Sequence, residues 1–255
     1  MTTSTAGRVV VERRDRVLLV RMDRPAKRNA VDAPMTAALD AALNELEDDP
    51  DLWCGVLTGG PEVFCAGTDL VQGPGDPTPR GGNYGVVRRR RTTPLVAAVE
   101  GVAYGGGFEI VLACDLVVAG ESARFGLPEV ARGVVANCGA LFRAPRPLPL
   151  TVAKQMLLTG RPMAAARAHE LGLVSELVAD GGAEAAALDL AAAICANSPV
   201  AVGATLAAVE KVVGAADELG WAATAEAAAV TDASADRAEG VAAFLEKREP
   251  QWTGR

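Results

Sequence analysis

Residues 94–116 read PLVAAVEGVAYGGGFEIVLACDL, and this stretch decides the fold class. The apolar run at 95–99 is typical of a buried strand. Three glycines follow at 105–107, and helical periodicity then runs to about Cys114. Glycine carries no side chain that would block a ligand, so the backbone N–H groups of this loop can point at a substrate atom. The pattern predicts a strand, a glycine loop and a helix in succession.

A second, shorter unit of the same kind precedes this one. Residues 64–70 read FCAGTDL and follow the apolar run at 56–58. The two units form a weak internal repeat. Backbone donors from two such loops can converge on one carbonyl oxygen as an oxyanion hole, where the loss of one donor costs about 2.7–4 kcal/mol in acyl chemistry.

Two carboxylates stand close to these loops in the sequence. Glu109 directly follows the second glycine loop, and Glu129 lies in the segment FGLPEV. Taken alone, each is also typical of the first turn of a helix, where a carboxylate stabilises the helix dipole. Beside a polarised carbonyl, two acids can add and remove protons at the neighbouring carbon atoms. The combination favours proton-transfer chemistry at carbon.

The flanking segments extend an α/β pattern. Residues 9–12 and 16–22 are β-rich and predict a hairpin. Asp32 is placed to cap a helix that begins near Pro34. Residues 71–91 are rich in proline and glycine at their start, and they predict a mobile surface loop, a candidate lid, that leads into a short basic helix.

Helical signals dominate the C-terminal part of the chain. Alanine-rich helices are expected at about 183–197, 199–213 and 218–232, with a last helix at about 237–248. Strands that alternate with helices before this part predict an α/β core. The helical quarter predicts an added region that packs on itself or on a neighbouring subunit.

Composition and charge argue against several classes of function. The 255 residues carry a net charge of −7, which disfavours general nucleic-acid binding. We expect no transmembrane helix, because no uncharged apolar run of about 18 residues occurs. The N-terminal residues do not resemble a signal peptide, so a cytoplasmic location is expected. The basic cluster 88–91 is either a solvated helix end or loop, or a contact for the phosphates of an anionic ligand.

The chemistry-bearing side chains exclude further classes. Five cysteines are scattered without CxxC spacing, so they predict neither a disulfide framework nor a zinc site. His169 is the sole histidine, which rules out a metal site built from several imidazoles. A Ser-His-Asp triad would lack its GxSxG serine motif. We therefore expect no metal ion.

Five segments together resemble the enoyl-CoA hydratase/isomerase (crotonase) family in order and spacing. They read MDRPAKRNAVD, FCAGTDL, PLVAAVEGVAYGGGFEIVLACDL, ARFGLPEVARG and AAFLEKREPQWTGR, and the resemblance runs over about residues 9–255. It implies an α/β fold, a crotonase-like spiral of ββα units with two nearly perpendicular sheets and a C-terminal helical trimerisation region. It divides the chain into a spiral core with the acyl-CoA site at 1–198 and a helical oligomerisation region at 199–255.

The resemblance also implies substrates and partners. Family members act on acyl-CoA thioesters and form trimers that often pair into hexamers, so a homotrimer or a dimer of trimers is expected. Neither nucleic acid nor a membrane is expected as a partner. No cofactor is expected, because coenzyme A is part of the substrate.

Residue by residue, the resemblance assigns the two oxyanion donors to the N–H groups of Thr68 and Gly106. The family commonly has alanine at the position of Thr68, whose side chain either narrows the pocket or adds a hydroxyl near the thioester. Asp69 matches a family aspartate and is expected to cap the following turn. The positions that match the coenzyme A path are Lys27, Arg28, Ala30, Ala66, Asp69 and Leu70.

Glu109 and Glu129 match both acidic positions of the true hydratases, whereas many relatives keep only one or neither. We therefore predict an enoyl-CoA hydratase, which adds water reversibly to 2-enoyl-CoA through an enolate that the oxyanion hole stabilises. In this hypothesis Glu109 orients and deprotonates the water, and Glu129 delivers the proton to Cα.

Alternatives stay open. An isomerase of 3-enoyl-CoA needs only one mobile acid, for which Glu129 would suffice, and a dehydratase of another 3-hydroxyacyl-CoA, such as a carnitinyl-type thioester, belongs to the same class. A non-catalytic acyl-CoA-binding scaffold on this fold is a third possibility, against which the retention of both acids speaks. Residues 134–150 depart from the family's glycine-rich IPGAGGTQRL-like stretch, so the acyl preference is open.

Overall fold

The computed structural model describes residues 3–6 and 8–255, which form a large mixed sheet and a small second sheet. The strand order in the large sheet is β1-β2-β3-β4-β5-β7-β10. The first three strands pair antiparallel, and those from β3 to β10 pair parallel. The strands are β1 (Thr3–Ala6), β2 (Val9–Arg14), β3 (Val17–Met22), β4 (Cys54–Thr58), β5 (Leu95–Val99), β7 (Leu116–Gly120) and β10 (Glu176–Val178).

The small sheet positions the glycine loop. It consists of β6 (Val102–Tyr104), β8 (Arg124–Gly126) and β9 (Met163–Ala164), in the order β6-β8-β9. β6 leads into the loop at 105–107, and its parallel neighbour β8 leads into the 3-10 helix η3 (Pro128–Arg132). This pairing brings Glu129 and the glycine loop to the same end of the small sheet.

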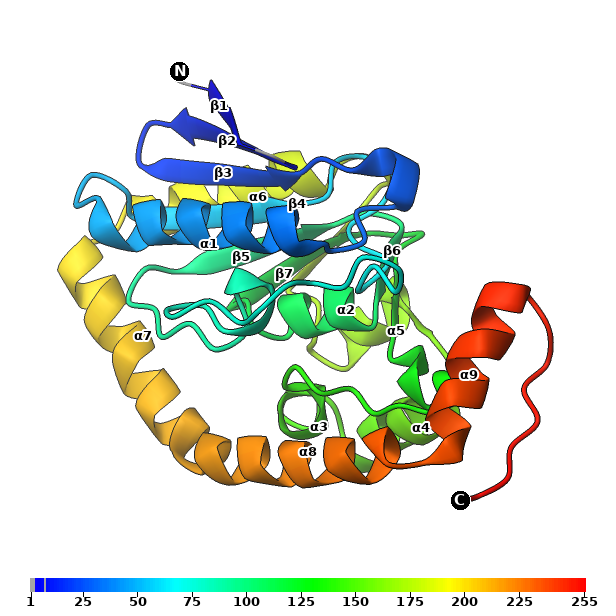
Figure 1. Cartoon of the computed structure of the whole chain (residues 1–255). Coiled ribbons are helices and arrows are strands. Elements are labelled where there is room, and N and C mark those ends of the chain that lie inside the picture. Colours follow the sequence, from blue (N-terminus) through cyan, green and yellow to red (C-terminus); the bar gives the residue numbers. More distant parts are fainter. Residues whose placement is uncertain (1–2, 7) are drawn as a thin grey trace.

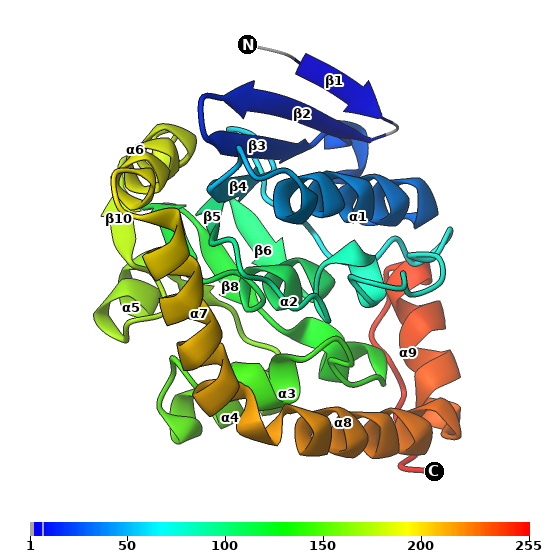
Figure 2. The same cartoon turned by 90° about the vertical axis from the view of Figure 1, so that its left-hand side faces the viewer.

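Helices cover both faces of the large sheet (Figures 1 and 2). The main core, which contains Phe64, Phe108 and Phe125, includes residues of α1 (Ala33–Asp48) and α2 (Gly106–Val111). A smaller cluster of valine and alanine lies between the opposite face and α6 (Ala183–Cys195).

Helix α1 follows from local signals in the sequence. The Asp32 carboxylate accepts a hydrogen bond from Met35 N at 3.1 Å, and Pro34 lies in the first turn, where its missing N–H has no cost. One face of α1 carries apolar side chains at helical spacing, and these are fully buried. They are Met35, Leu39, Leu43 and Leu46. Burial of one such side chain contributes about 1.5–3 kcal/mol.

The C-terminal helices form an arm that bends around the lower part of the molecule in Figure 1. It consists of α7 (Pro199–Val213), η4 (Gly214–Ala216), α8 (Asp217–Asp232) and α9 (Ala235–Glu246). α7 contains no buried residue, whereas Trp221 of α8 packs edge-on against Phe142 of α3 (Ala140–Arg143). The other helical elements are η1 (Pro25–Lys27), η2 (Asn83–Gly85), α4 (Leu150–Thr159) and α5 (Ala165–Glu170).

One helical run in the described part of the chain, Pro199–Asp232, is long and apolar enough to cross a membrane by length and composition. No such run was predicted from the sequence. The 3-10 helix η4 divides this run into α7, with 15 residues, and α8, with 16 residues, which point in different directions (Figure 1). A transmembrane helix needs about 20 residues, so each of the two is shorter than a membrane span. The run is therefore weak evidence for a membrane helix.

The main predicted elements are present, and the differences lie in short segments. The hairpin and the capped helix at Pro34 are confirmed. The short basic helix predicted at the end of 71–91 is wrong, because only the turn η2 and irregular backbone occur there. β1, β6 and β9 were not predicted. The division into 1–198 and 199–255 stays a prediction.

Candidate active site

Three loops that leave β3, β4 and β6 are hydrogen-bonded to one another. Val31 N donates to Gly67 O at 2.8 Å, and Asp69 N donates to Val31 O at 2.9 Å. Tyr104 N donates to Cys65 O at 3.0 Å. The two glycine loops, which are distant in sequence, therefore lie side by side.

The N–H groups of Thr68 and Gly106 have no hydrogen-bond acceptor within the described residues. Gly106 is the first residue of α2, where an amide has no acceptor inside the helix. Gly67 has φ +103°, and a Cβ built on it would stand 2.9 Å from Tyr104 O and 3.4 Å from Gly106 N. Glycine thus allows the loops to approach this closely. The oxyanion hole formed by these two N–H groups stays a prediction.

Glu109 lies in the first turn of α2 and is 1% exposed. Its Oε1 accepts hydrogen bonds from Cys138 N at 2.7 Å and Ala140 N at 3.1 Å. Burial, followed by the charge of Glu129, raises the pKa of Glu109 to about 8, although the two amide donors act in the opposite direction. The sequence analysis did not foresee that the segment departing from the family pattern would orient this acid.

Glu129 lies in η3, directly over the glycine loop. A Cβ built on Gly105 would stand 3.1 Å from Glu129 Oε1, so the carboxyl group rests against this glycine. Its Oε2 is buried and has no hydrogen-bond partner within the described residues. Burial raises the pKa of Glu129 to about 7, an effect that its own N–H and the charge of Arg132 partly offset. A buried polar atom without a partner is costly and is typical of functional sites.

The two carboxyl groups titrate as a pair, because each charge disfavours the other. With pKa values of about 8 for Glu109 and about 7 for Glu129, the pair carries about one proton in total between about pH 7 and pH 8, mainly on Glu109. One carboxyl can then accept a proton while the other donates one.

Arg24, which the sequence analysis did not single out, ties two of the loops together. It is 5% exposed, and its Nη1 lies 2.7 Å from Asp69 Oδ2 and 2.9 Å from Ala30 O. Asp69 Oδ1 accepts hydrogen bonds from Val71 N and Gln72 N, as a turn-capping residue does. The bond from Gln72 N and the pairing with Arg24 lower the pKa of Asp69 to about 2. Both oxygens of this carboxylate are therefore engaged within the chain.

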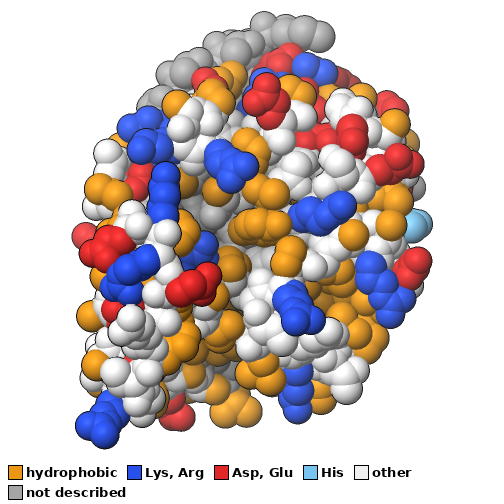
Figure 3. All heavy atoms as spheres, turned by 90° about the vertical axis from the view of Figure 1, so that its right-hand side faces the viewer, with side chains coloured by type: hydrophobic (Ala, Val, Ile, Leu, Met, Phe, Trp, Pro, Cys, Tyr) orange, Lys and Arg blue, Asp and Glu red, His pale blue; other side chains and the backbone are white. Residues whose placement is uncertain are grey.

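The other residues predicted to contact coenzyme A lie along the same loops. Lys27 and Arg28 are exposed at η1, which lies at the upper right in Figure 1, and Leu70 is also exposed. Ala30 and Ala66 are half-buried, and Ala66 N donates to Arg28 O at 2.9 Å. On the same side of the molecule, hydrophobic side chains gather in a hollow among lysine and arginine side chains (Figure 3). Contact with coenzyme A stays a prediction for all of these residues.

The basic cluster 88–91 is largely engaged in contacts within the chain. Arg89 is buried and pairs with Asp40 of α1. Arg91 pairs with Asp115 through two hydrogen bonds, from Nη1 to Oδ2 at 2.5 Å and from Nη2 to Oδ1 at 2.9 Å. The interpretation as a solvated helix end is therefore wrong for these two arginines, and neither is free to bind a phosphate.

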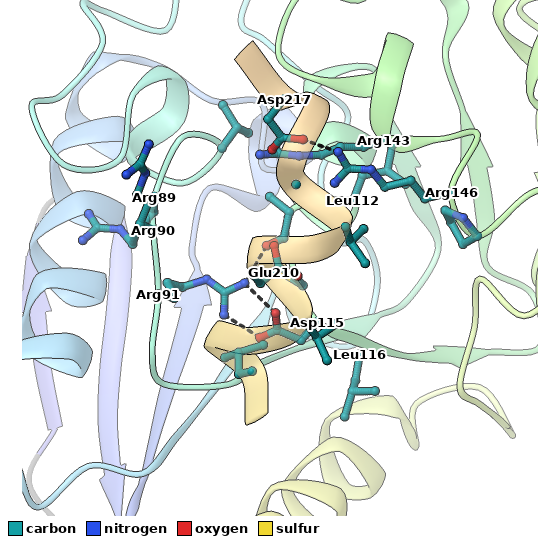
Figure 4. A pocket seen from close by; sticks show the side chains of 18 of the residues that line it. Arg89, Arg90, Arg91, Leu112, Asp115, Leu116, Arg143, Arg146, Glu210 and Asp217 are labelled. Carbon is teal, nitrogen blue, oxygen red and sulfur yellow. Dashed lines mark hydrogen bonds and ion pairs between the residues drawn. The ribbon is translucent and has the colours of Figure 1, made fainter. Parts of the chain in front are cut away.

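These arginines line a cavity of about 1000 Å³ between the core and α7 (Figure 4). Arg143 and Arg146 approach it from the other side, and Arg146 pairs with Asp217 of α8. None of the four predicted catalytic and oxyanion residues lines this cavity. It is distinct from the candidate active site.

Known proteins resemble this chain over its whole length. The chain matches the model of the enoyl-CoA hydratase/isomerase family over residues 12–255. It is 40% identical to enoyl-CoA hydratase EchA19 of Mycobacterium tuberculosis, a match that covers 100% of this chain and 99% of the relative. The chain belongs to the enoyl-CoA hydratase/isomerase family. It is also 36% identical to 2,3-dehydroadipyl-CoA hydratase of Escherichia coli, over 97% of this chain and 99% of that one.

Solved structures agree with this assignment. The carnitinyl-CoA hydratase from Mycobacterium avium superimposes with a TM-score of 0.93 at 42% identity, covering 98% of this chain and 100% of the other. An enoyl-CoA hydratase from Mycobacterium tuberculosis gives a TM-score of 0.79 at 42% identity, with the same coverage. The predicted crotonase fold is confirmed, and the similarity to hydratases over the full length identifies the chain as a hydro-lyase of this family.

Proposed function

We propose that this hydro-lyase adds water reversibly to the double bond of a 2-enoyl-CoA thioester, with Glu109 and Glu129 as the catalytic pair. One observation carries the proposal: two buried carboxyl groups with raised pKa values lie beside the two glycine loops, in which the N–H groups of Thr68 and Gly106 have no acceptor within the described residues. The similarity to hydratases of coenzyme A thioesters supports the substrate class.

The N–H groups of Thr68 and Gly106 hold the thioester oxygen in this proposal. Attack of water at Cβ builds negative charge on that oxygen, and two preorganised donors stabilise the resulting enolate without reorganising solvent. Because α2 begins at Gly106, its dipole adds positive potential at the same point.

The two acids divide the proton transfers between them. With pKa values of about 8 for Glu109 and about 7 for Glu129, the shared proton lies mainly on Glu109 before the substrate binds, so it passes to Glu129 ahead of the attack. Glu109, then charged and stabilised by the two amide donors on its Oε1, takes a proton from the attacking water, and Glu129 delivers its proton to Cα. The same two steps in reverse order dehydrate the 3-hydroxyacyl thioester.

The remaining predictions complete the proposal. Lys27 and Arg28 contact the phosphates of coenzyme A, and Ala30, Ala66 and Leu70 line its path. The reaction needs no metal ion and no cofactor beyond the coenzyme A of the substrate. The enzyme acts in the cytoplasm as a homotrimer or a dimer of trimers that assembles through residues 199–255.

A thioester panel tests the proposal. Crotonyl-CoA and longer 2-enoyl-CoAs, incubated with the enzyme, are expected to gain the mass of one water. Glu109→Gln keeps an acceptor for the two amides but loses the base, so it is expected to lower the hydration rate by about 10²–10⁴-fold. Hydration at the wild-type rate in this variant would contradict the role of Glu109 and favour an isomerase. Tight binding of every thioester without turnover would favour a scaffold.

A further inference from the structure

Tyr84 is a buried residue of the segment 71–91 that the proposed mechanism does not use. It has φ +59° and ψ +5°, in the left-handed region that bulky residues rarely adopt. The next residue, Gly85, is pressed against α1, because a Cβ built on it would stand 2.7 Å from both Thr36 O and Asp40 N. Strained backbone of this kind persists only where its surroundings enforce it, and it clusters at functional sites.

The strained turn carries the phenol of Tyr84 into the candidate active site. Its Oη lies 2.8 Å from Thr68 Oγ1. A Cβ built on Gly106 would stand 2.3 Å from this Oη and 2.6 Å from Cζ, so the phenol rests against one of the two proposed oxyanion residues. Burial, followed by the nearby thiol of Cys138 and the charge of Glu109, raises the pKa of Tyr84 well above its ordinary value. The phenol therefore stays protonated.

Tyr84 and Thr68 each have one O–H donor, and the hydrogen bond between them uses only one of the two. The other O–H is left without a partner in this pair. Either oxygen can be the donor, and the second O–H finds no oxygen or nitrogen acceptor within the described residues. The Cys138 sulfur, a weak acceptor, is an alternative partner. A buried donor that lacks a good acceptor costs free energy, which a ligand oxygen placed there would recover.

We propose that Tyr84, held by Thr68, is a specificity-determining residue that selects acyl groups carrying a hydroxyl or carbonyl oxygen beyond Cβ. The inference rests on the proposed function, because that function places the thioester oxygen at the N–H of Gly106, the residue against which the phenol lies. The phenol forms a wall of the acyl pocket and donates a hydrogen bond to the substrate oxygen. A plain hydrocarbon chain leaves the donor with only the weak sulfur acceptor of Cys138, and a site built to bond a substrate oxygen discriminates against analogues that lack it.

The test compares 2-hexenoyl-CoA with its 4-, 5- and 6-hydroxy derivatives. The wild-type enzyme is expected to show a higher kcat/KM for at least one hydroxylated substrate. Tyr84→Phe is expected to lower that preference by about tenfold, as the loss of one hydrogen bond does, because kcat/KM falls more for the hydroxylated substrate than for 2-hexenoyl-CoA. Thr68→Val removes the partner hydroxyl and is expected to lower the same preference.

Tyr104→Phe is the matched control, since Tyr104 is the other tyrosine of the chain and no hydrogen bond of its hydroxyl occurs within the described residues. It is expected to leave the preference unchanged. An equal loss on all four substrates in Tyr84→Phe would overturn the inference, as would a wild-type preference for 2-hexenoyl-CoA over every derivative. If Tyr84→Phe does not fold, Thr68→Val decides by the preference alone: a preference for the hydroxylated substrate that stays unchanged in Thr68→Val would overturn the inference. A wild-type enzyme that hydrates none of the four would instead overturn the proposed function, which is a different result.

Discussion

At the scale of single residues, burial determines whether Glu109 and Glu129 can donate and accept protons near neutral pH. A carboxyl in water is ionised at neutral pH and is a poor proton donor, whereas desolvation raises the pKa of both groups into the range of about 7 to 8. Glu109 receives two amide hydrogen bonds, and Glu129 Oε2 receives none within the described residues. This asymmetry gives each acid a separate task.

The raised pKa values predict a bell-shaped pH profile. Below about pH 7 both carboxyls become protonated and the base is lost, and above about pH 8 both become ionised and the acid is lost. The dependence of kcat/KM on pH, measured with crotonyl-CoA, is therefore expected to peak between these limits and to fall on both sides. A rate that stays flat from pH 5 to pH 9 would contradict the pairing of the two acids.

Sequence reasoning found the acids but not the residues that surround them. Glu109 and Glu129 stand in recognisable segments, and their positions follow from the order of those segments. The amides of Cys138 and Ala140 reach Glu109 from the segment 134–150, which departs from the glycine-rich stretch of the family. Tyr84 escaped notice because its position depends on a strained turn, which periodicity does not reveal.

At the scale of elements, the site is assembled from loops. A network of buried ion pairs holds these loops against one another. Arg24 follows β3, and its guanidinium meets Asp69 of the first glycine loop. Asp32, the cap of α1, also lies against Arg24 and pairs with Arg8 at 2.6 Å. Both aspartates are buried, so the network fixes the loop that carries Lys27 and Arg28 against the loop that carries Thr68.

Removal of Arg24 is therefore expected to destabilise the protein. Arg24→Met leaves Asp69 buried without its cation, which predicts a loss of about 3–5 kcal/mol in the free energy of unfolding. Arg167→Met is a control, because it removes an exposed arginine paired with Glu170, and a loss below about 1 kcal/mol is expected. Urea unfolding at neutral pH measures both. Equal effects of the two substitutions would contradict the role given to Arg24.

Elements with local signals were predictable, and those set by distant partners were not. The start of α1 is encoded by Asp32 and Pro34 and was found. β6 contains three residues and β9 contains two, and each forms because it pairs with β8. Segments this short show no periodic pattern of apolar residues from which a strand could be predicted. The basic cluster 88–91 was misread because the partners of Arg89 and Arg91 come from α1 and from the start of β7.

Helix α7 of the C-terminal arm has little packing within the described part of the chain. α7 buries none of its residues within the chain, and its valines Val200, Val209, Val212 and Val213 are exposed. Exposed apolar side chains gathered on one element are typical of a protein interface. The proposed trimer would cover this helix.

Charges on α7 are expected to weaken the proposed assembly. The double substitution Val209→Asp and Val212→Asp is expected to shift the protein from trimer or hexamer toward monomer in sedimentation velocity. Val71→Asp, which alters an exposed valine outside the arm, is expected to leave the assembly intact. A wild-type enzyme that sediments as a monomer would contradict the proposed oligomer.

The central claim is that one thioester oxygen receives both amides while the two acids face the neighbouring carbons. A crystal structure of Glu109→Gln with an unreacted 2-enoyl-CoA tests it most directly. We expect the thioester oxygen at about 2.7–3.1 Å from both Thr68 N and Gly106 N, with the Glu129 carboxyl at Cα and the substituted side chain at Cβ. A thioester oxygen that contacts neither amide, or a Glu129 carboxyl turned to solvent, would contradict the claim.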